Sequence, residues 1–350
     1  MGATLLGTIL SSDKTNISVL TGDRVTHLLL ISLANIKMAT CLKLSSHAFL
    51  LAALLPVPKF VHNNKQMKGV LEARLIRQCL DIVLAPLKQA AKLGVMLSDP
   101  WGQSRYCFTL MASYIVDTPE AALLAMVGGK TSPVTMASYK QFGDNFLHEP
   151  CTSSTTLAQI EVVASIADPE DIEAFFREAQ KFRLNGVHMP FWCDVTMSCP
   201  SKFFNPEILH HFHKEFGDHD AKWCINALGS AEIDFRFSIL QPVTGFRHFK
   251  EGISSLKQVT GRTLRDIQRY IVGVIAGHAP RDVIFAVRAL MDFRYRIQAY
   301  RITDRDIDII NAALHEFHLH KDSILDASLR HGKANTLANP QKSPRASQIL

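Results

Sequence analysis

Two aspartates follow apolar, strand-like segments about a hundred residues apart in this chain. Asp13 follows the run 5–10 within the sequence Ser-Asp-Lys-Thr, and Asp117 follows the run 106–116 and precedes Thr-Pro-Glu. A carboxylate at the point where a buried strand meets solvent is held firmly and stays hydrated, which suits a Mg²⁺ ligand. Aspartate is also a common turn former. The order of elements around the pair therefore has to decide between a metal site and two turns.

The segments around the two aspartates follow a defined order. Short β-prone runs predict a three-stranded meander at 5–10, 16–20 and 28–33, with Asp13 at the end of its first strand. Helical periodicity then predicts a helix from about 66 to 97, with a kink at Pro86, before the strand that delivers Asp117. Three strands, a helix and a strand is the order of an RNase H-like core, in which the first and fourth strands are neighbours. We therefore predict an α/β fold with such a core.

The second half of the chain is mainly helical in pattern. Asp168-Pro169 and Asn205-Pro206 are cap sequences that predict helix starts. Three further helices are expected at 261–277, 281–294 and 303–329. We expect residues 1–150 to form the core, 151–259 a helical insertion, 260–329 C-terminal helices that complete the core, and 330–350 a basic disordered tail.

Composition excludes some classes of protein. With 47% hydrophobic and 20% charged residues, the chain predicts a globular fold with a sizeable core. The longest uncharged apolar run, 48–57, is well short of the roughly 20 residues that a membrane span needs. Seven cysteines without Cys-x-x-Cys spacing indicate reduced thiols, and no basic secretory leader is present. We therefore expect a nuclear or cytoplasmic protein without a membrane partner.

Longer stretches carry a resemblance to one family. They are Ser-Asp-Lys-Thr at 12–15, Tyr-Ile-Val-Asp-Thr-Pro-Glu at 114–120, the His-rich run 206–223, and the segments 232–237 and 261–270. With these motifs the chain resembles the Plavaka transposases of fungal DNA transposons, which are relatives of the CACTA group. The resemblance implies an RNase H-like nuclease core with a helical insertion. It also implies Mg²⁺- or Mn²⁺-dependent cleavage and strand transfer at transposon ends, with DNA as partner, and it leaves a homo-oligomer open.

The resemblance assigns the first two catalytic, metal-binding acids to Asp13 and Asp117. The third family acid is a glutamate that opens a helix, and Thr263 occupies its position. Two-metal phosphoryl transfer needs anionic oxygens, for which a hydroxyl is a poor substitute. Asp266, one turn further on, and Glu232 are the candidate replacements. We therefore expect a truncated, degenerate copy that has lost strand transfer; an active metal-dependent nuclease or transposase using Asp266 or Glu232 is the alternative.

Other candidate metal ligands are less specific. Relatives commonly carry a zinc-binding Cys-x-x-Cys pair after the second acid, whereas segment 129–135 has no thiol here, so zinc is not expected. Glu207 and His210 match an acid-x-x-His element of several transposase superfamilies, and His213 shares a helical face with His210. These three side chains are either metal ligands or a structural surface cluster.

A basic stripe provides a candidate DNA contact. Arg262, Arg265 and Arg269 recur at helical spacing, and eight arginines fall between 262 and 301. One helix face would then meet a phosphate backbone. The alternative is a solvated face whose arginines pair with nearby acids. This stripe also supports a third hypothesis, a domesticated DNA-binding protein, which predicts salt-sensitive DNA binding that is indifferent to Mg²⁺.

Overall fold

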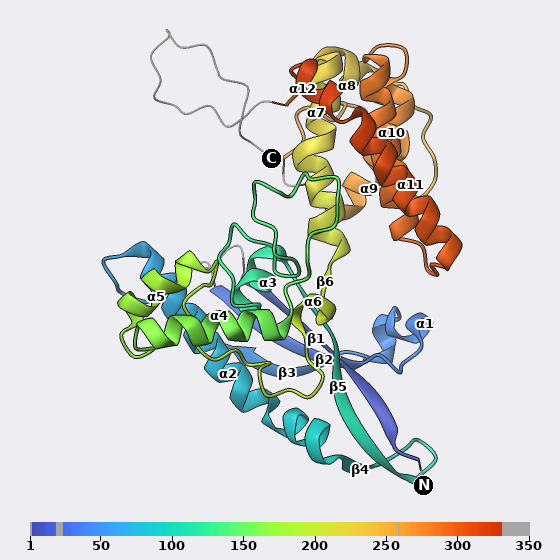
Figure 1. Ribbon diagram of the computed structural model, residues 1–350. Helices are drawn as coiled ribbons and strands as arrows, with labels where there is room; N and C mark the ends of the chain where they lie inside the picture. Colours follow the sequence, from blue (N-terminus) through green and yellow to red (C-terminus); the bar gives the residue numbers. More distant parts are fainter. Residues whose placement is uncertain (1, 19–23, 258, 331–350) are drawn as a thin grey trace. The chain divides into compact units, whose positions relative to one another are not determined.

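The computed structural model describes residues 2–18, 24–257 and 259–330, and the chain divides between Pro206 and Glu207 into two compact units (Figure 1). Apart from Arg330, the expected basic tail lies outside the described residues. This division reflects only that each part of the chain is compact by itself. The expected boundaries of core and insertion, at 150 and 259, stay a prediction.

A six-stranded mixed sheet forms the centre of the first unit (Figure 1). Its strands are β1 (Thr4–Ser18), β2 (Arg24–Leu33), β3 (Leu50–Leu55), β4 (Val95–Ser98), β5 (Ser104–Val116) and β6 (Phe204–Pro206). The order is β3-β2-β1-β5-β4, and β6 also pairs with β5. β1 is antiparallel to β2 and parallel to β5, and β6 is parallel to β5. The predicted α/β class is confirmed, as is the adjacency of the first strand and the strand that delivers Asp117.

The predicted meander is wrong in its first turn. β1 continues without a break through Asp13 to Ser18, so Asp13 lies within a strand and not at its end. The third strand is β3, far beyond the expected position. Pairing of β1 with β5 ends at Ser11, and the residues after it pair with β2 alone. Apart from buried Ser12, residues 13–17 are exposed, and all of them except Ile17 are polar, as expected for a turn.

Helix α2 (Lys65–Leu93) covers one face of the sheet, where Ile76, Leu80 and Leu84 join the core. The helix ends earlier than predicted because Gly94 has φ +75°, which is not a helical conformation. Glycine is needed at this position, since a Cβ would lie 2.5 Å from the Tyr106 ring. The next four residues form β4 and pair with β5. Pro86 lies inside the helix.

Six shorter helical elements complete the first unit. They are α1 (Met38–Cys41), η1 (Leu44–Ser46), α3 (Thr118–Leu124), α4 (Ser153–Ile166), α5 (Ile172–Lys181) and α6 (Pro200–Phe203). The cap predicted at Asp168 is three residues early, since the Asp171 side chain caps α5, and the expected helix start at 205–206 is strand β6. Phe191 and Trp192 are both buried in the core of this unit, and the Trp192 indole donates to the Leu124 carbonyl (3.0 Å).

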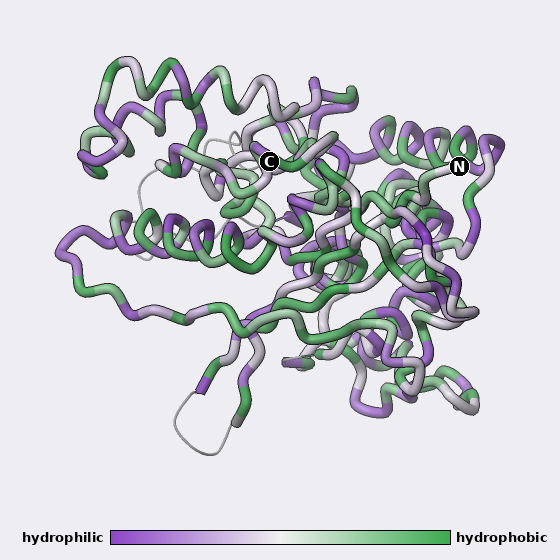
Figure 2. Tube along the Cα trace, turned by 90° about the horizontal axis from the view of Figure 1, so that it is seen from below, coloured by the Kyte–Doolittle hydropathy of each residue, from purple (hydrophilic) through white to green (hydrophobic). Residues whose placement is uncertain are grey.

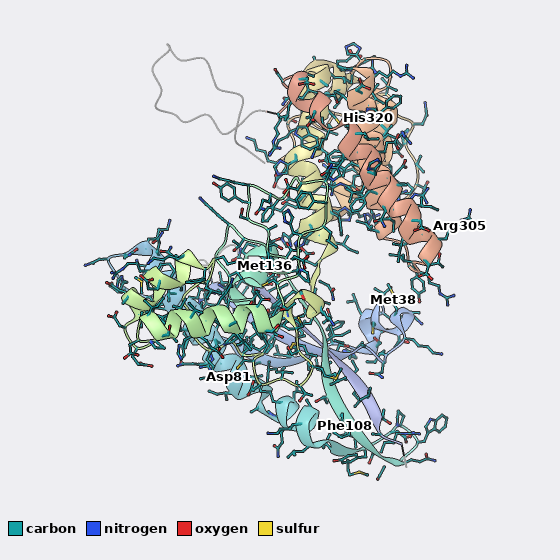
Figure 3. The ribbon with its side chains drawn as sticks, viewed as in Figure 1. Met38, Asp81, Phe108, Met136, Arg305 and His320 are labelled. Atoms are coloured by element: carbon teal, nitrogen blue, oxygen red, sulfur yellow. The ribbon has the colours of Figure 1, made fainter. Side chains whose placement is uncertain are left out.

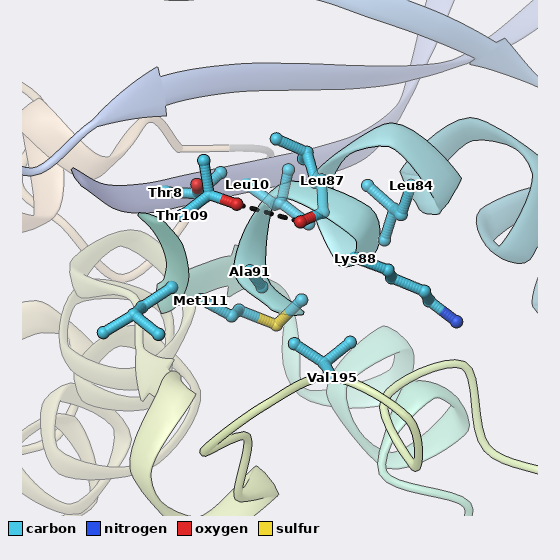
Figure 4. A pocket seen from close by; sticks show the side chains of 10 residues that line it. Thr8, Leu10, Leu84, Leu87, Lys88, Ala91, Thr109, Met111 and Val195 are labelled. Carbon is cyan, nitrogen blue, oxygen red and sulfur yellow. Dashed lines mark hydrogen bonds between the residues drawn. The ribbon is translucent and has the colours of Figure 1, made fainter. Parts of the chain in front are cut away.

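A small cavity lies between α2 and the sheet (Figure 4). It measures about 20 Å³ and is lined mainly by apolar side chains such as Leu10, Leu84 and Met111. Thr109 at its edge donates to the Leu87 carbonyl (2.8 Å). This space suits at most one water molecule, so it is a packing gap and not a ligand site.

The second unit is helical. Its elements are η2 (Leu209–Lys214) and η3 (Phe216–Asp220), both π-helical, then α7 (Ala221–Leu228), α8 (Ser230–Ser238), α9 (Gly261–Ile275), α10 (Arg281–Ile297), α11 (Asp304–His320) and α12 (Asp322–Asp326). Phe216, Phe237 and Ile271 are fully buried in its core. The helices predicted at 261–277 and 281–294 are confirmed, and the one at 303–329 is divided between α11 and α12. Hydrophilic and hydrophobic residues are interspersed along the helical parts of the trace (Figure 2).

In the described part of the chain, no helix combines the length and apolarity that crossing a membrane would need.

Candidate metal centre

Asp13 lies on β1, and Asp117 directly follows β5, the parallel neighbour of β1. Ser11 of β1 pairs with Ile115 of β5, and each aspartate lies two residues further along its own strand direction. Side chains two residues apart in extended chain share a face, so both aspartates project from the face opposite buried Ser12. Asp13 is exposed and Asp117 is half-buried. The register therefore brings the two predicted acids to one edge of the sheet, on one face.

Local hydrogen bonds orient each carboxylate. Asp117 is the N-cap of α3, and its Oδ1 accepts the Glu120 backbone N–H (2.8 Å). Asp13 Oδ2 accepts the Thr15 hydroxyl (3.0 Å). Asp13 is exposed and Asp117 is half-buried, and carboxylate oxygens are the donors that Mg²⁺ and Mn²⁺ prefer. The donor set fits a divalent ion, although two carboxylates are fewer than a two-metal site uses.

The position assigned to the third acid lies in the second unit. Thr263 is buried in the first turn of α9, where its Oγ1 accepts a guanidinium N–H of Arg247 (3.1 Å). Asp266 is also buried, and its Oδ2 accepts the Arg247 backbone N–H (3.1 Å). Glu232 forms an ion pair with Arg236 (2.6 Å). Both replacement acids thus have partners within their own unit, and their convergence with Asp13 and Asp117 stays a prediction.

The acid-x-x-His segment has a geometry that its sequence does not reveal. Leu209–Lys214 is π-helical, so the face expected for His210 and His213 from α-helical spacing is wrong. Glu207 contacts the His210 ring, while His213 is buried, and burial together with nearby Arg265 lowers the His213 pKa. Throughout residues 2–18, 24–257 and 259–330, no three His, Cys, Asp or Glu side chains gather closely enough to hold a metal ion. The metal role of these residues stays a prediction.

Hydrogen bonds hold the segment that lacks the family thiols. Gly128 N–H donates to the Arg183 carbonyl (2.7 Å), and the Arg183 guanidinium donates to the Ser132 carbonyl (2.7 Å). The Ser132 hydroxyl in turn accepts the Thr135 N–H (3.0 Å). Arg183 has φ 64°, a left-handed conformation that is uncommon for a residue with a Cβ. A central arginine therefore cross-links this segment of the described chain.

The basic stripe lies on the exposed side of α9. Arg262 donates to the Gly245 carbonyl (2.8 Å), and the Arg269 guanidinium lies 4.0 Å from the centre of the Phe246 ring. None of Arg262, Arg265 and Arg269 forms an ion pair with an acid among the described residues. Two of the three arginines therefore support the neighbouring loop, and the alternative of acid-paired arginines is not observed in the described chain.

Sequence reasoning missed a buried polar network beneath the aspartates. Glu120 Oε1 lies 2.5 Å from Ser12 Oγ and 2.8 Å from His27 Nε2, and Ser12 Oγ lies 3.2 Å from the Tyr114 hydroxyl. The motifs around the two acids contain Ser12 and Glu120. His27 lies on β2, and nothing in the linear sequence connects it to them.

Enzymes that transfer phosphoryl groups with metal ions hold those ions with carboxylates, and Asp13 and Asp117 are candidates for that role. A sequence model of the Plavaka transposase family matches residues 1–224, which is more than half of the chain and includes Asp13 and Asp117. The chain therefore belongs to the Plavaka transposase family, a family of DNA transposases. The match ends before Glu232 and Thr263. No curated protein matches the chain.

Proposed function

We propose that this chain is a degenerate DNA transposase that binds DNA and a divalent ion but does not transfer strands. The observation that carries the proposal is the alignment of Asp13 and Asp117 on one face of parallel strands, while a neutral Thr263 occupies the third acid position. The strand order, with an antiparallel β3-β2-β1 unit and parallel β1 and β5, supports an RNase H-like core.

Asp13 and Asp117 would hold Mg²⁺ or Mn²⁺ between them. Bound divalent ions activate the attacking oxygen and stabilise the leaving oxygen in phosphodiester displacement. The protein's part is to hold the carboxylates rigidly, and the β1–β5 pairing and the α3 N-cap serve that purpose. A hydroxyl at the third position removes one negative charge, so we expect weak binding of the ion and no strand transfer.

The test combines DNA and metal binding with cleavage. Purified protein is titrated with Mn²⁺ and Mg²⁺ beside an Asp13→Ala/Asp117→Ala variant, and labelled duplex DNA is used to score binding and cutting. We expect DNA binding by both proteins, Mn²⁺ binding by the unaltered protein alone, and cutting by neither. Metal-dependent cutting that disappears in the double variant would overturn the inactive assignment and establish the active alternative.

The arginine stripe makes a separate prediction for DNA affinity. Arg265 is exposed on α9 between two arginines that support the loop. Arg265→Gln should weaken duplex binding several-fold and lower the slope of log affinity against log salt by about 1, because one phosphate contact is lost. Electrophoretic or fluorescence titration at three salt concentrations measures both quantities.

Arg177→Gln is the matched control, because Arg177 is exposed on α5 and its replacement changes the net charge equally. An equal loss of affinity in both variants would show a general charge effect and contradict the stripe. DNA binding that needs the stripe but ignores both Mn²⁺ and the two aspartates would favour the domesticated DNA-binding protein.

A further inference from the structure

A buried hydrogen-bond network links β1, β2, β5 and α3 on the face of the sheet opposite the two aspartates. Its centre is Glu120 Oε1, which lies within hydrogen-bond distance of Ser12 Oγ (2.5 Å) and His27 Nε2 (2.8 Å). Tyr114 is completely buried and extends the network through its hydroxyl, 3.2 Å from Ser12 Oγ. Ser12 and His27 are 4% and 2% exposed. Such burial makes each lost hydrogen bond costly.

The number of protons fixes the direction of the network. An ionised carboxylate only accepts, so Ser12 and His27 both donate to Glu120. The Ser12 proton is then used, and the Tyr114 hydroxyl must donate to Ser12 Oγ. Burial and the nearby Glu120 charge raise the pKa of Tyr114, which keeps that proton in place. Ser12 and His27 thus both donate to the Glu120 carboxylate, which is held by partners within the protein.

The same glutamate is tied to both candidate metal ligands. Its backbone N–H donates to Asp117 Oδ1 (2.8 Å), and its carboxylate holds Ser12, the residue before Asp13. Backbone pairing between β1 and β5 ends at Ser11 and Ile115. Beyond that point, the contacts through Ser12 and Glu120 continue the cross-link between the segments that carry the two acids.

We propose that Glu120 is a positioning residue that fixes the spacing of Asp13 and Asp117 for a divalent cation. This inference rests on the proposed function, because it requires the two aspartates to bind the ion. Glu120 supports the ligands from behind, as outer-shell partners do in metal sites, and does not coordinate the ion. Its replacement should therefore change metal affinity more than it changes the fold.

Glu120→Gln keeps the shape of the side chain and removes the charge that receives both donors. We expect the Mn²⁺ dissociation constant to rise about 10-fold, within the range found for outer-shell substitutions. Mn²⁺ binding is measured by electron paramagnetic resonance of the free ion, and the thermal midpoint is measured without metal on the same samples. Glu161→Gln is the matched control, since Glu161 is exposed on α4 of the same unit.

A second variant covers the case in which Glu120→Gln fails to fold. Ser12→Ala removes one donor from the carboxylate and should raise the dissociation constant about 3-fold, a smaller effect because the His27 bond and the Asp117 cap persist. Support requires weaker Mn²⁺ binding in the folded variants and none in the control.

Two results would overturn the inference, and they differ. If Mn²⁺ binding needs Asp13 and Asp117 but is unchanged in Glu120→Gln and Ser12→Ala, Glu120 has only a structural role and the proposed function stands. If the Asp13→Ala/Asp117→Ala variant binds Mn²⁺ as tightly as the unaltered protein does, the proposed metal site and the proposed role of Glu120 are both wrong.

Discussion

Arg294→Met is expected to destabilise the second unit by about 3–5 kcal/mol at pH 7. The Arg294 guanidinium is 9% exposed beside Asp220, which is 2% exposed, and Nη2 and Oδ2 are 2.9 Å apart. The two groups form a buried ion pair. Nη1 also donates to the Phe212 carbonyl (2.5 Å). Methionine would leave a carboxylate buried without its counter-charge, and that accounts for the size of the effect.

Hydrogen exchange of the α9 and α10 amides, followed by mass spectrometry, measures the free energy of opening in this unit. Arg288→Met is the control on the same helix, because Arg288 pairs with Asp292 and Glu316 at 41% exposure and should cost less than about 1 kcal/mol. Adding Asp220→Asn to Arg294→Met removes the buried charge and should restore much of the loss. Equal costs at Arg294 and Arg288 would contradict the argument.

The destabilisation caused by Arg294→Met should depend on pH, which provides a second test of the same prediction. Burial raises the pKa of Asp220 to about 6 from 3.8, although Arg294 opposes the rise. A raised folded-state pKa means that the protonated acid favours folding, so this contribution is complete below pH 3.8 and is lost as the pH rises through about 6. Without Arg294 the pKa rises further. The penalty of Arg294→Met should therefore be smaller at pH 5 than at pH 7.

The strands and helices that the sequence predicted best are those with a strong apolar pattern. Strand β5 is mainly apolar in its second half, and α9 and α10 carry clear amphipathic periods. The continuity of β1 was missed, because the polar residues between the predicted runs 5–10 and 16–20 indicated a turn, whereas they pair with β2. The end of α2 was missed because the apolar residues after Gly94 continue the helical pattern, whereas Gly94 adopts φ +75° and ends the helix.

The sequence predicted the two candidate metal ligands, Asp13 and Asp117, but not the hydrogen-bond network that supports them. Asp13 and Asp117 could be predicted because each follows an apolar run in the sequence. Their placement side by side depends on the parallel register of β1 and β5. The role of His27 depends on the pairing of β2 with β1, which carries no local signal. The sequence likewise carries no local signal for the π-helical turns around His213, because this geometry comes from tertiary packing and not from helix propensity.

Thr263→Glu is expected to confer Mn²⁺-dependent DNA cutting on this chain, for which we propose binding of DNA and a divalent ion without cutting. Thr263 is the third residue of α9, and its backbone N–H donates to the Thr260 side chain that caps the helix. The first turn of a helix favours a negative charge, and the Arg247 guanidinium lies beside this position, so α9 should tolerate a glutamate. Anionic stabilisation of several kcal/mol corresponds to a gain of about 100-fold or more over background.

Thr263→Gln is the matched control, because glutamine has the same length and no charge. Nicking of supercoiled plasmid at several Mn²⁺ concentrations compares the two variants, and Asp117→Ala in the Thr263→Glu background tests whether the new activity uses the proposed site. Cutting in the glutamate variant alone, abolished by Asp117→Ala, would show that one missing charge separates this chain from an active transposase. If the glutamate variant binds Mn²⁺ and DNA but does not cut, Thr263 is not the sole cause of inactivity, and the degeneration extends to other residues of the chain.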